Sequence, residues 1–211
     1  YSQSEKGEIK IDKFLKKSLK LRKIWCASST HVSEEIFCGK IHKELKKKYK
    51  NLLTIIIPRH IERVHSIKSD LSKLELKIQT YSSKEKIKKD TDIYIVDSYG
   101  KTKSFYYQCK NVFLGGSLIN HGGQNPLEAA RYGCNIMHGP NVSNFHEIYK
   151  FLKKIKISKK ISNQSQILYF LNKFLTEKTN LEKTNKKLNL IGQKILNSTY
   201  QQINILLKNE I

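Results

Sequence analysis

The stretch LLTIIIPRHIER, residues 52–63, joins a continuous apolar run to a charged segment. Such a run is typical of a strand that is buried on both faces of a parallel sheet. Other β-rich runs lie at residues 23–28, 74–80, 92–97, 111–116 and 134–139. Helical patterns lie between them, at about residues 33–49, 60–72, 102–109, 126–132 and 144–154. This alternation predicts an α/β fold with a Rossmann-like doubly wound parallel sheet.

The chain is expected to have three parts. Residues 1–20 are polar and lysine-rich and are predicted to form a linker or lead-in helix. Residues 21–155 are predicted to form the Rossmann-like domain, and residues 156–211 a tail of C-terminal helices. In that tail, residues 184–208 carry apolar side chains at helical spacing, and an exposed apolar stripe would favour self-association. Because the chain begins with Tyr1 rather than Met, we expect it to be a piece of something longer.

The most distinctive feature of the composition is its excess of positive charge. The 211 residues include 40 Lys and Arg against 18 Asp and Glu, which gives a net charge of +22. This balance favours anionic partners such as nucleic acid, an acidic membrane surface or phosphorylated substrates. Lys, Ile and Asn are abundant throughout, as an AT-rich genome would produce. The aromatic–basic interleaving of single-strand binding platforms is absent, so nucleic-acid binding is not expected.

The four cysteines, Cys26, Cys38, Cys109 and Cys134, form no C-x-x-C pair, so neither a zinc knuckle nor a thioredoxin-like site is predicted. Three of them have mostly apolar or small neighbours, which predicts buried, reduced thiols and a cytosolic compartment. No apolar run approaches the roughly 18 residues needed to span a bilayer. No signal peptide is expected either.

The segments that follow the predicted strands are the candidate site, because ligands of doubly wound sheets bind beyond the carboxyl ends of the strands. They are SSTHVSEE (28–35), PRHIER (58–63), DSYG (97–100), GGSLINHGGQNPLEAA (115–130) and GPNVSNFHE (139–147). Small, polar and ring-bearing residues collect in these segments. In the first, Thr30 or Ser33 is suited either to cap the next helix or to bind a ligand.

The stretch 115–133 contains five of the ten glycines. Asn125 and Pro126 suit the start of a helix, and Glu128 can reach back toward the cap. That capping leaves four glycines unexplained, namely Gly115, Gly116, Gly122 and Gly123. They indicate a close approach of the backbone, and bare amides at a helix N-terminus favour an anion. The segment is neither a Walker loop nor G-x-G-x-x-G.

Positively charged and imidazole side chains follow other strands. Arg59 and Arg63 are suited either to a solvated helix start or to a phosphate clamp. His31, His60 and His121 lie on different loops and lack the spacing of metal ligands, so no metal site is expected.

Together the strand-end segments resemble the bacterial 3-deoxy-D-manno-octulosonic acid (Kdo) transferases of lipopolysaccharide synthesis. That family combines a Ser-Thr-His turn and an acidic pair with P-R-H-x-E-R, D-x-x-G, G-G-S…G-G-x-N-P-L-E-x-A and G-P-x-x-x-N-F. Here the corresponding segments are residues 29–35, 58–63, 97–100, 115–130 and 139–145, in the same order. The resemblance covers residues 21–155 well.

The resemblance implies the C-terminal, donor-binding half of a GT-B fold. It implies a CMP-Kdo donor, transfer of Kdo onto a lipid A precursor, inversion at the anomeric carbon and no metal or other cofactor. In the family the N-terminal half carries the membrane anchor, the acceptor site and the catalytic base. This chain shows no counterpart of that half. We therefore expect the chain alone to be soluble and inactive, and the whole protein to work on the cytoplasmic face of the inner membrane.

The resemblance also implies roles for single residues. Arg59 would face the CMP phosphate or the sugar carboxylate. The amides of Gly122 and Gly123, with the helix start at Asn125, would stabilise the leaving phosphate, and Glu128 would accept from the ribose hydroxyls. The full set of predicted donor-binding residues is Ser29, Thr30, His31, Arg59, His60, Gly100, Gly115, Gly116, Ser117, Gly122, Gly123, Gln124, Asn125, Glu128 and Asn144.

Two positions depart from the family pattern. Lys101 stands where the family usually has Glu, which reverses the charge after Gly100. Gln124 stands where the family usually has His, and it cannot titrate near neutral pH. Two other functions remain open from the residues alone. One is a related GT-B enzyme that uses a UDP-sugar, and the other is a non-catalytic basic module that binds nucleic acid or anionic lipid.

Overall fold

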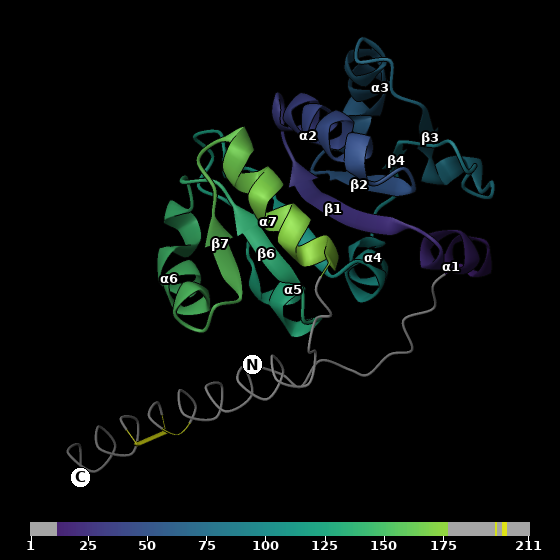
Figure 1. Ribbon diagram of the computed structural model, residues 1–211. Coiled ribbons are helices and arrows are strands. Elements are labelled where there is room, and N and C mark those ends of the chain that lie inside the picture. Colours follow the sequence, from purple (N-terminus) through teal and green to yellow (C-terminus); the bar gives the residue numbers. More distant parts are fainter. Residues whose placement is uncertain (1–11, 177–196, 198–199, 202–211) are drawn as a thin grey trace.

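The computed structural model describes residues 12–176, 197, 200 and 201, and it contains a parallel sheet flanked by helices (Figure 1). The strands are β1 Lys23–Thr30, β2 Leu52–Pro58, β3 Ile78–Thr80, β4 Ile93–Ile95, β5 Asn111–Leu114, β6 Asn135–His138 and β7 Ser158–Lys160. Their order in the sheet is β3-β4-β2-β1-β5-β6-β7, and every neighbouring pair is parallel. The predicted Rossmann-like α/β fold is thus confirmed.

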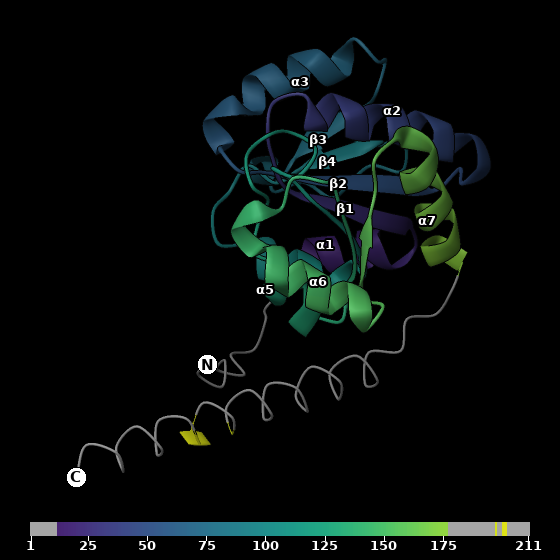
Figure 2. The same cartoon turned by 90° about the vertical axis from the view of Figure 1, so that its left-hand side faces the viewer.

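Helices cover both faces of the sheet (Figure 2). They are α1 Lys13–Lys20, α2 Glu34–Lys48, α3 Val64–Ser72, α4 Thr102–Gln108, α5 Leu127–Arg131, α6 His146–Lys154 and α7 Gln164–Thr176. Short 3₁₀ turns occur at η1 Ile61–Arg63, η2 Tyr81–Ser83 and η3 Ser143–Phe145. Buried side chains of α2, α3 and α7 share one core cluster, and those of α1, α4, α5 and α6 share the other.

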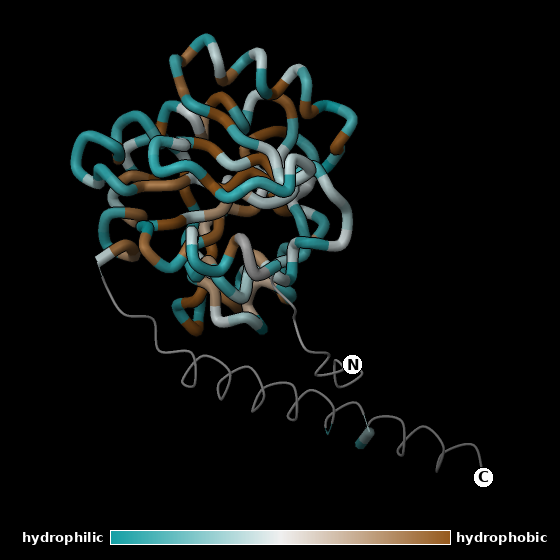
Figure 3. The backbone as a smooth tube through the Cα atoms, turned by 90° about the vertical axis from the view of Figure 1, so that its right-hand side faces the viewer, coloured by the Kyte–Doolittle hydropathy of each residue, from teal (hydrophilic) through white to brown (hydrophobic). Residues whose placement is uncertain are grey.

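The apolar runs supply both cores because successive side chains of a strand point to opposite faces. In β2, Ile55 packs into the core beneath α1 and α4, while Ile56 packs into the core beneath α2 and α3. In β1, Cys26 packs into the same core as Ile55, and Trp25 packs into the same core as Ile56. Hydrophobic residues follow the strands through the interior, and hydrophilic residues predominate in the outer turns (Figure 3). Every residue of β2 is buried, as its unbroken apolar run predicts.

The sheet and its cores extend beyond residues 21–155. In the predicted tail, β7 pairs with β6, and α7 buries Ile167 and Leu171 against the sheet. In the predicted lead-in segment, α1 buries Leu15 and Leu19. The stretch 184–208 lies outside the described residues apart from three positions, so its predicted helix and its self-association stay predictions.

A network of polar side chains lies at the amino edge of the sheet, opposite the carboxyl ends of the strands. The ring of His42 is fully buried, with Nδ1 2.9 Å from Thr54 Oγ1 and Nε2 3.2 Å from Asp92 Oδ1. Lys46 Nζ lies 3.0 Å from the same carboxylate oxygen, and Asp92 Oδ2 accepts from the Lys77 amide. These hydrogen bonds and the Lys46 cation hold the pKa of Asp92 well below its usual range, although burial acts in the opposite direction.

All four cysteines are buried and none forms a disulfide, as the apolar neighbours of three of them predict. Burial is the main cause that raises the pKa of each thiol. Thiolate chemistry is disfavoured at such positions. Within the part of the chain that the structure describes, no helix has the length and apolarity needed to cross a membrane.

Candidate functional site

The five strand-end segments meet at one edge of the sheet. They follow β1, β2, β4, β5 and β6, and all of these strands are parallel. The chain builds outward from β1 through β2 on one side and from β5 through β6 on the other, so the switch point lies between β1 and β5. Ser28 is in register with Leu114 there, which places the turn after β1 beside the glycine-rich loop. This is the position at which doubly wound sheets bind their ligands.

A buried carboxylate joins these two loops. Glu34, the first residue of α2, is 1% exposed. Its Oε2 accepts from the backbone amides of His31 at 3.0 Å and Gly116 at 2.8 Å. Its Oε1 accepts from the amides of Ser117 at 3.2 Å and Leu118 at 3.0 Å. Burial raises the pKa of Glu34, and these four hydrogen bonds act in the opposite direction.

Three histidines that come from different strand ends lie together. The ring of His31 lies 4.2 Å from the ring of His121 and 6.0 Å from that of His60, between centroids. Burial, followed by the neighbouring histidines and then Arg63 and Arg59, lowers the pKa of His31 to about 4. His31 is therefore neutral near pH 7, and its Nε2 can accept from the Gln124 amide nitrogen 3.4 Å away.

The two arginines of the PRHIER segment differ in their surroundings. Arg63 forms a bidentate ion pair with Glu35, with N–O distances of 3.0 and 3.1 Å, and the Glu35 side chain is only 3% exposed. Arg59 has an exposed side chain, while its backbone amide donates to the Thr30 carbonyl. Arg63 is thus committed to a structural pair, and Arg59 is the arginine that an anion can reach.

Close contacts with neighbouring parts of the protein explain much of the glycine clustering. A Cβ on Gly115 would lie 2.7 Å from the Thr30 Cα and 2.8 Å from Glu34 Oε2. A Cβ on Gly122 would lie 2.6 Å from Cγ of Asn144, and Gly122 has a φ of +90°. Both positions therefore need glycine for contacts within the protein itself. The amides of residues 116–118 are occupied by Glu34, and the amide of Gly123, which the resemblance assigned to the leaving phosphate, donates to the Gly116 carbonyl at 2.9 Å.

The short helix after the glycine-rich loop starts one residue later than the capping pattern predicts. α5 begins at Leu127, whose amide donates to the side chain of Asn125 at 3.0 Å. Glu128 does not close a capping box, since its carboxylate faces Lys103 with Oε1 3.9 Å from Nζ. Glu128 is half-buried, so its oxygens remain accessible to a ligand hydroxyl.

Other predicted site residues make contacts within the protein or are buried in it. Ser117 is fully buried, and its Oγ donates to the Leu114 carbonyl and accepts from the Gly139 amide at 2.8 Å. Thr30 is also fully buried, and within the described residues its Oγ1 has no hydrogen-bond partner. Asn144 is exposed, and its Nδ2 donates to the carbonyl of His121, which holds the glycine-rich loop in place.

The remaining predicted residues lie at the same strand ends. Ser29 is half-buried in a bulge of β1 with a φ of +55°. Gly100 is exposed in the loop after β4, and a Cβ there would have no neighbour within 4 Å. That loop reaches η1 through Tyr99, whose hydroxyl donates to Glu62 at 2.9 Å.

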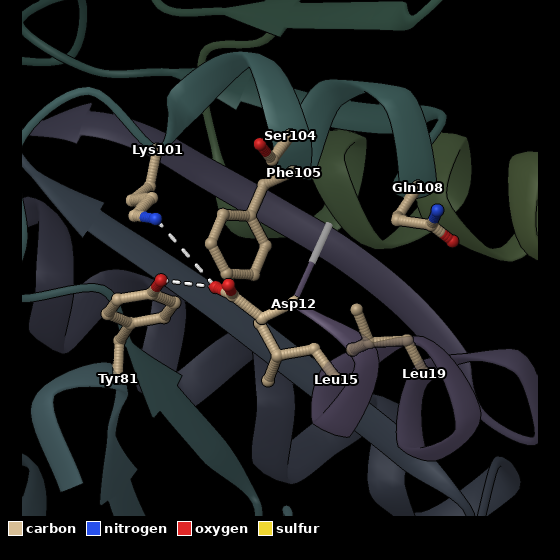
Figure 4. A pocket seen from close by; sticks show the side chains of 8 residues that line it. All are labelled: Asp12, Leu15, Leu19, Tyr81, Lys101, Ser104, Phe105 and Gln108. Atoms are coloured by element: carbon tan, nitrogen blue, oxygen red, sulfur yellow. Dashed lines mark hydrogen bonds and ion pairs between the residues drawn. The ribbon is translucent and has the colours of Figure 1, made fainter. Parts of the chain in front are cut away.

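Lys101 points toward Asp12, the residue that precedes α1, and toward Tyr81 (Figure 4). Its Nζ lies 3.8 Å from Asp12 Oδ2 and 5.2 Å from the centroid of the Tyr81 ring. The Tyr81 hydroxyl also donates to Asp12. We call these three residues the Asp12 clasp. The charge reversal at position 101 thus has a structural partner in this chain, since Asp12 supplies the negative charge that Lys101 faces.

Two residues of this site were quoted in the sequence without any role, Glu34 and Glu35. The pairing of Glu35 with Arg63 has a recognisable signal, because a buried acidic pair needs partners and an arginine follows the next strand. Glu34 has no such signal, because its partners are backbone amides.

Among the described residues, the three histidines are not arranged as metal ligands. Within residues 12–176, no group of three or more His, Cys, Asp or Glu side chains is arranged to hold a metal ion. The absence of a cofactor requirement stays a prediction.

The fold and the position of the site define a Rossmann-like domain of the GT-B type. No protein-family model matches the chain. Among curated proteins, the chain is 36% identical over 135 residues to a Kdo transferase of Haemophilus influenzae, covering 64% of this chain and 32% of the relative. It is 31% identical over 207 residues to a Kdo transferase of Rickettsia bellii, covering 95% of this chain and 49% of the relative.

A solved structure matches as well. The chain aligns with the C-terminal CMP-Kdo binding domain of WaaA from Acinetobacter baumannii at a TM-score of 0.72 and 24% identity, covering 87% of this chain and 97% of that domain. The predicted similarity to the Kdo transferases is therefore confirmed, and the fold is that of their C-terminal domain. The chain spans half or less of the length of the curated relatives named above, between 32% and 49%.

Proposed function

We propose that this chain is the donor-binding part of a glycosyltransferase that moves Kdo from CMP-Kdo onto a lipid A precursor. One observation carries the proposal. The five segments that resemble the Kdo transferases, spread over residues 29–145, all lie at the carboxyl edge of one parallel sheet. The names of the relatives support a Kdo donor rather than the UDP-sugar alternative.

The charges at this edge suit a dianionic nucleotide sugar. CMP-Kdo carries one negative charge on its phosphate and one on the sugar carboxylate. Arg59 and the exposed rings of His60 and His121 supply donors on the loops after β2 and β5. As the bond to Kdo breaks, charge grows on the CMP phosphate, and a nearby guanidinium stabilises that state more than the ground state. In this proposal Arg59 performs that role.

Other groups of the site would hold the nucleotide. Glu128 can accept from the ribose hydroxyls, whereas the Gly123 amide is not available to the nucleotide because it donates to the Gly116 carbonyl at 2.9 Å. In this proposal the three side chains that the protein buries or uses internally, Thr30, Ser117 and Asn144, shape the site through its loops. No metal takes part. The acceptor-binding group and the catalytic base belong to another part of the transferase, which works at the inner membrane.

Calorimetric titration with CMP and with UDP tests the proposal. We expect CMP to bind more tightly than UDP, and Arg59→Ala to weaken CMP binding by about tenfold or more, the range of a lost charge-assisted hydrogen bond. Lys50→Ala is the matched control, since it also removes one exposed cation but lies at the start of β2, on the amino edge. Equal CMP affinities of Arg59→Ala and Lys50→Ala would contradict the role of Arg59.

The basic-module alternative makes a different prediction for the same experiment. Binding through many lysines would fall steeply with salt and would not distinguish Arg59→Ala from Lys50→Ala. A wild-type chain that binds neither nucleotide but binds polyanions in a salt-sensitive way would overturn the proposed function.

A further inference from the structure

We propose that Glu34 is a positioning residue of the donor site, where its carboxylate serves as an internal anion that fixes the glycine-rich loop on the turn after β1. This inference rests on the proposed function. Glu34 is too deeply buried, at 1% exposure, to meet a ligand itself. It acts through the loops that it holds.

Backbone amides surround the Glu34 carboxylate and form a binding site for a negative charge, which we call the anion seat. Four amides, of His31, Gly116, Ser117 and Leu118, converge on one carboxylate with N–O distances between 2.8 and 3.2 Å. Three of them lie on three successive residues of a loop in which Gly116 has a φ of +64°. Successive amides in such a conformation form a nest for a negative charge. Within the described residues Glu34 has no ion pair, so these amides are the groups that compensate its charge.

The anion seat connects the turn after β1 with the glycine-rich loop, and both of these segments face a ligand. One side of it is the His31 amide, and the His31 ring contacts His121 and Gln124 from the glycine-rich loop. The other side is the start of that loop, whose Gly115 amide also donates to the Ser28 carbonyl at 2.8 Å. Without the carboxylate, four amides would lose their acceptor, three of them buried, and a buried donor without an acceptor is destabilising. The loop would then leave the conformation that presents His121 and Gln124.

The same geometry decides which amides a donor phosphate can use. The amides of residues 116–118 already point at Glu34, and the Gly123 amide donates to the Gly116 carbonyl at 2.9 Å, so the phosphate must be met elsewhere, by Arg59 and the exposed histidines. Glutamine cannot replace Glu34, because its NH₂ group would face amide donors. Glu34→Ala removes CH₂–COO⁻, a group with the size and charge of acetate. An acetate ion can therefore refill the seat.

The test is calorimetric titration of the whole chain with CMP, using Glu34→Ala in excess sodium acetate or in sodium chloride of the same ionic strength. In chloride we expect the Kd for CMP to rise about tenfold or more relative to wild type, which corresponds to about 1.4 kcal/mol. In acetate we expect the variant to recover affinity, while acetate does not strengthen CMP binding to wild type. Glu34→Gln should lose affinity without recovering it in acetate.

Asp92→Ala is the matched control. It also removes a mostly buried carboxylate that accepts a backbone amide, but it lies at the amino edge of the sheet. We expect Asp92→Ala to keep the CMP affinity of wild type. Its affinity therefore shows whether a general loss of stability is enough to weaken CMP binding without any change to the anion seat. Folding of each variant is checked by near-ultraviolet circular dichroism.

Folded Glu34→Ala and Glu34→Gln variants with wild-type affinity for CMP would overturn the inference, and so would a Glu34→Ala variant that responds equally to acetate and chloride. If Glu34→Ala is too unstable for titration, the readout becomes its Tm in the two salts. A rise specific to acetate supports the seat, and equal Tm values refute it. Failure of the wild-type chain to bind CMP would instead contradict the proposed function, and the Tm comparison would still decide whether the seat takes an anion.

Discussion

His138 gives the protein an acid-sensitive step in stability. It ends β6, is 4% exposed, and its ring lies 4.2 Å from that of Tyr149. Its Nδ1 is 2.7 Å from the carbonyl oxygen of Gly139. Burial lowers the pKa of His138 from 6.5 to about 4; the hydrogen bond to Gly139 opposes this shift, and Lys160 and Lys153 add to it.

The sign follows from the two pKa values. The unfolded chain binds a proton at this position near pH 6.5, whereas the folded chain binds it only near pH 4. The stability contributed by neutral His138 is therefore complete above pH 6.5 and declines as the pH falls toward 4. Below pH 4 both states are protonated and the loss is complete. At pH 5 the loss is about 2 kcal/mol.

Urea unfolding at pH 7 and pH 5, followed by circular dichroism, measures this loss. His138→Phe keeps the ring beside Tyr149 and gives up one hydrogen bond, which should cost about 1 kcal/mol at pH 7. Between the two pH values wild type should lose about 2 kcal/mol more than this variant. Met137→Ala, a buried neighbour on β6, lowers stability without removing an imidazole and should keep the pH dependence of wild type. Equal losses in wild type and His138→Phe would refute the reasoning.

Two further predictions concern the loops and the ion pair of the site. Gly115→Ala forces a Cβ against backbone and should lower the free energy of unfolding by about 3 kcal/mol, whereas Gly100→Ala, with open space around it, should cost about 1 kcal/mol. Urea midpoints that are equal for the two variants would contradict the close approach at Gly115. Glu35→Gln leaves Arg63 half-buried without its carboxylate and should cost about 2 kcal/mol, and adding Arg63→Met should recover part of that loss. A double-mutant cycle in urea measures the coupling, and a coupling near zero would show that the pair contributes nothing.

The sheet was predictable because its inner strands are almost entirely apolar. LLTIIIP is buried at every position, and a sequence of that kind has few alternatives to a central parallel strand. β7 was not predicted, because the sequence Ser-Lys-Lys at residues 158–160 has no apolar alternation. It pairs with one strand only, at the edge of the sheet, where polar side chains are tolerated. The packing of α1 and α7 likewise depends on tertiary contacts that their local patterns do not reveal.

The site was predictable in its location but only partly in its contacts. Parallel strands bring their carboxyl ends together, so His31, His60 and His121 had to share an edge. Their ring contacts depend on loop conformations that the sequence does not specify. Three of the four amide partners of Glu34 lie 82 to 84 residues away, and every residue except proline carries such a group. No side-chain pattern could have identified them. The Gly123 amide, which was expected to meet the donor phosphate, is instead occupied by the Gly116 carbonyl.

The Asp12 clasp has a consequence for any shortened form of the chain. A protein that starts at residue 21 would lack α1 and would uncover the apolar surface on which Leu15 and Leu19 now rest. It would also leave the Lys101 cation at the start of α4, where the positive end of the helix dipole disfavours it, without the carboxylate of Asp12. Truncation at that point would thus remove part of the hydrophobic core and a counter-charge together, so the practical starting point for a minimal folded unit lies before Asp12.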